Sequence, residues 1–272
     1  MFKMLLLTSF IFCSLSFPGP VYAQNPTQMT HPIYALLNEQ LDYDISFLWF
    51  DRLAEGSITL TEGEDPATFL IIMQARTLGL AALFTRDRLE KFQTLMQIGA
   101  DGLLLPLWHS SHTVRGRGRS RSEKITKYSF DYKKAEVRYQ KIKNGRPYTD
   151  QLFDMEIDKP LFDILSALYN LRLGYFGAVG EERILIPTFH RKGPQDIIIE
   201  PLIKKDRKDK KFFANDPVQT RILVDPSVFG TKGRDILASF DAAMRPQKGI
   251  IKNVIGLGDV RGILRRLHVK KK

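Results

Sequence analysis

Four arginines in one short run are the residues best suited to bind a charged ligand. Arg115, Arg117, Arg119 and Arg121 alternate with glycine and serine. On an extended strand, alternate side chains share one face about 6–7 Å apart, so the four guanidinium groups would form a row. Such a row matches the phosphates or carboxylates of a lipid head group or a cell-wall polymer. The alternative is a solvated hairpin loop, which the charge run by itself favours.

Other candidate motifs are incomplete. His109 and His112 lie three residues apart, which is poor geometry for one metal ion on a strand, and no nearby residue completes a ligand set. Residues 256–259 (Gly-Leu-Gly-Asp) lack the third glycine and the lysine of a phosphate loop, so we expect a β-turn there. Neither GxSxG nor SxxK occurs. The sequence therefore predicts no catalytic, cofactor or metal site.

The N-terminus has the layout of a secretory signal peptide. A lysine at position 3 precedes an apolar run over residues 4–17, and the small residues Val21 and Ala23 follow a Pro-Gly-Pro break. The run is shorter than the roughly 20 residues that span a bilayer. We expect cleavage after Ala23 (signal peptide 1–23) and export to the periplasm. The only cysteine, Cys13, would be removed with it, leaving no disulfide or thiolate site.

Composition narrows the class of protein and of partner. Of 272 residues, 43% are hydrophobic and 26% charged, which excludes a wholly disordered chain, a collagen-like repeat and a polytopic membrane protein. The net charge of +11 at pH 7 favours anionic partners. After the signal peptide, no segment is apolar for long enough to span a membrane. An exported protein is also a poor candidate for binding nucleic acid. Basic blocks at 204–211 and 265–272 are interpreted as a hairpin tip and a frayed tail.

Hydrophobic patterning predicts a mainly β fold with one helix. Residues 160–173 have helical spacing, with Asp158 as the expected N-cap and Gly174 as the stop. Short segments elsewhere have the pattern of strands and recur every 8–14 residues or so, as in an antiparallel sheet, sandwich or barrel. These predicted strands are 41–49, 57–61, 67–76, 86–96, 125–130, 135–142, 183–189, 196–202, 220–224, 236–240, 249–255 and 262–267. We expect a flexible leader (24–40), a single β-rich domain (41–267) and a basic tail (268–272).

The chain resembles the exported bacterial domain-of-unknown-function 3108 family over residues 41–267. The matching stretches are Leu41–Ile45 with Ala54–Gly56, Ala75–Leu80, Phe84–Arg88, Asp163–Arg172, and Leu237–Phe240 continuing to Leu264. The resemblance implies a periplasmic protein built on one large curved antiparallel sheet, an open barrel or half-barrel with one helix crossing it. It implies no catalytic residues and leaves function open.

Five charged residues in these stretches are expected to form ion pairs or to line a pocket: Arg76, Arg86, Arg88, Asp163 and Arg172. Asp163 and Arg172 are nine residues apart on the predicted helix and about 180° apart around it, so they cannot pair with each other. Buried arginines are normally paired. We therefore expect one of the other three arginines to be the partner of Asp163, or to line a pocket.

Three functional hypotheses follow. The first is a non-enzymatic periplasmic binding protein, whose curved sheet forms an apolar groove for an amphiphile, with the basic surface favouring an anionic lipid. The second is an envelope structural or assembly factor that binds a protein or cell-wall partner through edge strands and the arginine run. The third is a hydrolase or lyase without a recognised motif. An unfilled apolar interior favours the first and a packed interior the second, while the oligomeric state is left open.

Overall fold

The computed structural model describes residues 31–47, 50–79, 82, 85–156, 159–191, 193–202 and 211–269. The predicted signal peptide lies outside this range, as does most of the basic block at 204–211. The first eight strands are β1 (Glu39–Phe47), β2 (Phe50–Glu62), β3 (Thr68–Thr77), β4 (Leu89–Ile98), β5 (Leu104–Arg115), β6 (Ser122–Asp131), β7 (Glu136–Lys143) and β8 (Arg146–Asp154). The other six are β9 (Ile184–His190), β10 (Gly193–Pro201), β11 (Val218–Leu223), β12 (Asp235–Phe240), β13 (Pro246–Val254) and β14 (Gly258–Val269).

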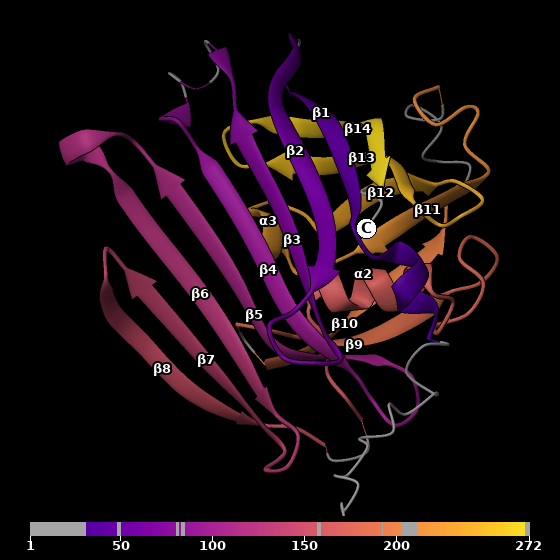
Figure 1. Cartoon of the computed structure of the whole chain (residues 1–272). Helices are drawn as coiled ribbons and strands as arrows, with labels where there is room; N and C mark the ends of the chain where they lie inside the picture. Colours follow the sequence, from indigo (N-terminus) through magenta and orange to yellow (C-terminus); the bar gives the residue numbers. More distant parts are fainter. Residues whose placement is uncertain are drawn as a thin grey trace, which may run out of the picture.

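All fourteen strands form one antiparallel sheet with a simple order. The chain runs outward from β1 to β8, crosses through helix α2 (Ile164–Arg172), and returns from β9 to β14, which pairs with β1. The two ends of the sheet, β8 and β9, do not pair, so the sheet is unclosed. The strands curve around α2 (Figure 1). The predicted fold class, a large curved antiparallel sheet crossed by one helix, is confirmed.

Helix α2 begins later than predicted because Asp163 caps it. The Asp163 carboxylate accepts hydrogen bonds from the backbone N–H groups of Leu165 and Ser166, and the Ser166 hydroxyl accepts one from the Asp163 N–H. This reciprocal capping box satisfies backbone groups that the first turn leaves unpaired. The expected N-cap, Asp158, lies outside the described residues. The predicted stop is confirmed, since Gly174 follows the helix with φ +80°.

Opposite faces of α2 pack against the two halves of the sheet. Leu165 and Tyr169 are buried in a cluster with residues of β1 to β5, whereas Ala167 and Leu171 are buried against β9 to β12. The first cluster also contains Ile33 of the short 3₁₀ helix η2 (Pro32–Leu36). The helix thus lies between the two halves of the sheet, and its apolar surface is covered on both sides.

Two buried polar contacts fix α2 along the sheet. The Asn170 side chain accepts a hydrogen bond from the Leu104 N–H (2.8 Å) and donates one to the Leu104 carbonyl (2.9 Å). Arg172 Nη1 lies 2.7 Å from Glu39 Oε1, and the two side chains are 1% and 8% exposed. The guanidinium also lies over the Tyr169 ring, 4.9 Å from its centre. A buried ion pair has strict geometry, so it sets the position of the helix end.

Several predicted boundaries are wrong. Gly56 does not end a strand but lies within β2, where it packs close to Ile45. Strands β5 and β8 were not predicted. Pro106 interrupts the apolar stretch at the start of β5, and the residues of β8 are mostly exposed and show little apolar alternation. The leader prediction fails for residues 32–40, which form η2 and the start of β1. The frayed-tail prediction fails for residues 265–269, which belong to β14.

Replacing Arg172 by methionine should destabilise the protein strongly. The substitution leaves the Glu39 carboxylate buried without its partner, which typically costs about 3–5 kcal/mol of unfolding free energy. Urea unfolding measures the change. The control is Arg76→Met, which breaks a surface pair with Glu55 and should cost less than about 1 kcal/mol. Equal losses in the two variants would contradict the role given to the buried pair.

Candidate functional site

An apolar cavity of about 370 Å³ lies between the two halves of the sheet, next to α2. Its walls come from β1 to β4 and from β11 to β14, with Phe229 from the short helix α3 (Pro226–Phe229). Ile164, Leu165 and Leu168 of α2 close one side. Further apolar lining residues are Tyr43, Ile45, Phe47, Ile58, Met73, Phe92, Ile222, Ile236, Phe240, Ile251, Val254, Leu257 and Val260. The volume is within the range of small-molecule binding sites.

The cavity is not filled by side chains because small residues are paired with one another across neighbouring strands. Ala238 is paired with Gly249, and Gly249 with Gly262. On the other wall, Gly56 is paired with Ala75. All five line the cavity, and a Cβ atom added at Gly262 would meet no other atom within 4 Å. Larger side chains at these positions would fill the space, so these five small residues keep the cavity unfilled.

The cavity wall also carries charge. The Arg88 guanidinium pairs with the Glu90 carboxylate, with Arg88 Nε 3.0 Å from Glu90 Oε1, and both residues line the cavity. Their side chains are 17% and 26% exposed. Arg76 also borders the cavity, but its side chain pairs with Glu55 and is 66% exposed. Arg86 is exposed and adopts a left-handed backbone conformation, φ +58°.

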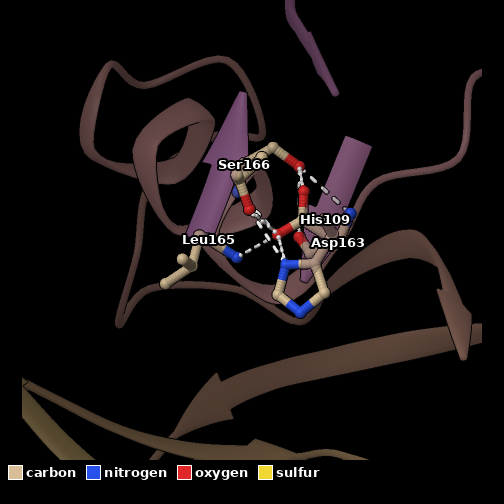
Figure 2. A network of polar contacts seen from close by, with 5 residues as sticks. His109, Asp163, Leu165 and Ser166 are labelled. Atoms are coloured by element: carbon tan, nitrogen blue, oxygen red, sulfur yellow. Dashed lines mark hydrogen bonds and ion pairs between the residues drawn. The ribbon is translucent and has the colours of Figure 1, made fainter. Parts of the chain in front are cut away.

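Asp163 pairs with a histidine and with none of the three arginines that were predicted either to pair with it or to line a pocket. Of these arginines, Arg76 and Arg88 line the cavity. Its carboxylate lies 2.9 Å from Nδ1 of His109 and accepts hydrogen bonds from the hydroxyls of Thr94 (2.6 Å) and Ser166 (2.7 Å), as Figure 2 shows in part. Burial alone would raise the pKa of Asp163, but the charge and hydrogen bond of His109 and the two hydroxyls outweigh it and lower the pKa. The partner is a histidine because β5 places His109 beside the N-terminus of α2.

This cluster is suited to holding the helix and not to nucleophilic catalysis. The Asp163 carboxylate lies between Ser166 and His109 and bonds to both. In a serine nucleophile site the imidazole would contact the hydroxyl directly. The His109 ring also stacks on Tyr128, with ring centres 5.6 Å apart. The contacts therefore join α2, β4, β5 and β6 in one buried polar network.

The arginine run does not form a continuous strand. Arg115 ends β5, Gly116 and Gly118 have positive φ, and the 3₁₀ turn η3 (Gly118–Ser120) leads to β6. Arg117 pairs with Asp87 (2.8 Å), and Arg121 lies 3.9 Å from Glu123. Arg119 is exposed on the turn. The four arginines therefore do not form a row, and the interpretation that the charge run favoured, a hairpin loop, describes residues 116–121.

The two histidines of the His109–His112 motif have separate partners, since His112 lies 2.5 Å from Glu123. The turn between β13 and β14 covers residues 255–257, so Gly256 and Leu257 lie in a turn as predicted, whereas Gly258 and Asp259 already belong to β14. Across the described ranges there is no group of three or more histidine, cysteine or acidic residues that could hold a metal ion. No helix in those ranges is long and apolar enough to cross a membrane.

Comparison with known proteins leaves the family open. No protein-family model matches the chain, and no curated protein matches it. A solved structure similar to it is the beta-barrel-like protein of domain of unknown function DUF1849 from Brucella abortus, at 12% identity. The match covers 87% of this chain and 99% of that one, with a TM-score of 0.47.

Sequence reasoning missed the residues that create the cavity. Gly249 and Gly262 fall within correctly predicted strands, where glycine is unusual. Glycines within strands were therefore a signal in the sequence that could have pointed to these positions. Its meaning depends on register, because only strand pairing places the two glycines side by side and facing inward.

Replacing Asp163 by asparagine should destabilise the protein in a pH-dependent way. Because the folded-state pKa of Asp163 is lowered, its stabilising contribution is complete above the unfolded value and is lost as pH falls through the folded value. The difference in unfolding free energy between wild type and variant should therefore shrink below about pH 4. Urea titrations from neutral to acid pH measure it, with Asp65→Asn on an exposed turn as control. A pH-independent difference would contradict the assignment.

Proposed function

We propose that this protein is an exported, periplasmic, non-enzymatic binding protein that carries an amphiphilic envelope ligand. The observation behind the proposal is the cavity, whose apolar lining has no side chains among the described residues to fill it. A folded interior is normally packed to the density of an organic crystal, so an empty apolar space of this size costs stability. A bound acyl chain would restore the missing contacts and bury its own apolar surface.

Export and family membership are part of the same proposal. The charged start, the apolar run and the small residues before Gln24 support a cleaved signal peptide. The stretches named above support membership of the domain-of-unknown-function 3108 family. Localisation is tested by sequencing the N-terminus of the protein from a periplasmic fraction. A chain that begins at Gln24 is the expected result, and an uncleaved chain retained in the cytoplasm would overturn this part.

The second candidate is an envelope assembly factor that binds a protein partner. It is favoured by the edge strand β8, which pairs only with β7 in the sheet and exposes Tyr148 and Leu152 by 53% and 63%. An edge strand of this kind can accept a strand from another chain. The unfilled cavity is better explained by a ligand, so the carrier hypothesis is preferred.

Filling the cavity should abolish binding without unfolding the protein. In a Gly262→Leu variant the new side chain would enter the cavity, since Gly262 has open space in front of it. Its affinity for the uncharged fluorescent probe phenylnaphthylamine should fall at least ~10-fold, a difference of about 1.4 kcal/mol in binding free energy. Fluorescence titration measures the affinity, and urea unfolding should show no loss of stability.

The matched control is Gly233→Leu, in the loop before β12 and outside the set of cavity-lining residues. It should bind the probe as tightly as the wild type. If neither the wild type nor the control binds the probe, the carrier hypothesis fails. If Gly262→Leu binds as well as the control, ligands enter the protein somewhere other than this cavity.

A further inference from the structure

A set of basic side chains lies at the end of the sheet away from α2. Antiparallel pairing brings the start of β4, the end of β5 and the start of β6 to one edge. Arg88 directly precedes Leu89, whose partner across the ladder is Val114, so Arg88 lies beside the last residues of β5. Arg115 ends β5, and Lys124 is paired with Thr113.

These side chains share the cavity face of the sheet. Glu90 lines the cavity and is paired with Thr113, which is paired in turn with Lys124. Paired residues point to the same side, and so do residues two apart on one strand. Arg115 is two residues beyond Thr113 and therefore faces the same way. On β7, Lys141 faces the same side as the buried Tyr139, and its ammonium lies 5.2 Å from the centre of the Tyr139 ring.

The cations of this cluster influence one another, although Arg115 and Lys124 are exposed to solvent. Burial lowers the pKa of Arg115, and Arg88 lowers it further, although Glu90 acts in the opposite direction. Burial also lowers the pKa of Lys124. The positive charges of nearby basic residues lower it further, in the order Lys141, Arg191 of the β9–β10 turn, Arg115 and Lys143. Like charges this close disfavour one another, and an anion between them would relieve the repulsion.

Acidic partners are scarce at this place. Glu90 is already paired with Arg88, and Asp225 accepts hydrogen bonds from Ser227 at the N-cap of α3 while feeling the charges of His190 and Arg191. The described residues offer no ion pair to Arg115, Lys124 or Lys141, whereas Arg138, Arg221 and Lys248 on other strands each have one. The cluster therefore carries net positive charge that the fold leaves unbalanced.

We propose that Arg88, Arg115, Lys124 and Lys141 bind the oxyanionic head group of an amphiphile whose apolar chain occupies the cavity. Arg88 connects the two parts, because it lines the cavity and adjoins the basic cluster. Guanidinium and ammonium groups bind phosphate and carboxylate oxygens through charge-assisted hydrogen bonds. The inference rests on the proposed function and adds the class of ligand, a single-chain anionic amphiphile, and its orientation.

The test compares ligands with the same dodecyl chain and different heads. The affinities of dodecyl phosphate, dodecanoate and uncharged dodecanol are measured by their displacement of phenylnaphthylamine. The proteins compared are the wild type, the cluster variant Arg115→Ser/Lys124→Ser, and a control variant. The control, Arg119→Ser/Lys133→Ser, removes the same charge from two exposed turns outside the cluster. Inorganic phosphate alone is a fourth ligand. Salt dependence is measured for each, since exposed charges are screened by ions.

The wild type and the control should bind dodecyl phosphate ~10-fold or more tightly than dodecanol, as expected for charge-assisted hydrogen bonds. In the cluster variant this ratio should fall to about threefold or less, with dodecanol binding unchanged, which also shows that the variant is folded. Dodecanoate binding as tightly as dodecyl phosphate would support oxyanion recognition in general. A preference for dodecyl phosphate would assign the cluster to phosphate heads.

Other outcomes separate the two proposals. If all dodecyl ligands bind equally well to every protein, the head-group site is wrong and the cavity proposal stands. If inorganic phosphate competes as well as dodecyl phosphate, the cluster is a free-anion site and the amphiphile inference is overturned. If the wild type binds neither the probe nor any dodecyl ligand, the proposed function itself fails.

Discussion

The position of α2 within the curved sheet is the constraint on which the rest of the structure depends. An antiparallel sheet with one apolar face must cover that face, and here a nine-residue helix covers part of it. Three buried polar contacts hold the helix in place, at Asp163, Asn170 and Arg172. Each has demanding geometry and a high cost when broken, so together they restrict the helix to one position.

Because α2 is fixed near one end of the strands, it cannot also fill the space towards the other end. Both walls carry small residues that leave this space unfilled, including the glycines paired across β13 and β14. The same end of the sheet gathers Arg88, Arg115 and Lys124. An apolar space and an unbalanced positive charge thus lie next to each other, and an anionic amphiphile satisfies both.

Local signals in the sequence predicted the strands and the helix well, because alternation and helical spacing report which residues are buried. They could not predict contacts between distant segments. Asp163 meets His109, 54 positions earlier, only because the register of β4 and β5 brings His109 opposite Thr94 and beneath the helix N-terminus. The arginine pattern was misleading for a similar reason: Gly116 and Gly118 turn the chain, and only Arg115 stays on the strand.

The predicted strand boundaries are wrong where contacts with other strands decide the backbone conformation. The predicted strand 57–61 begins after Gly56, yet Gly56 continues β2 because its lack of a side chain makes room for Ile45. The exposed strand β8 carries no burial pattern, and its pairing with β7 alone makes it a strand. In both places the backbone conformation is decided by neighbours from other strands, as is usual for β-structure.

The ligand proposed for the interior of the sheet is an anionic amphiphile. The most direct measurement is native mass spectrometry of the mature protein from a periplasmic fraction, followed by exposure to an extract of envelope lipids. We expect one single-chain anionic amphiphile per protein molecule, present on purification or taken up from the extract. A mass equal to that of the bare polypeptide, unchanged after the extract, would contradict it.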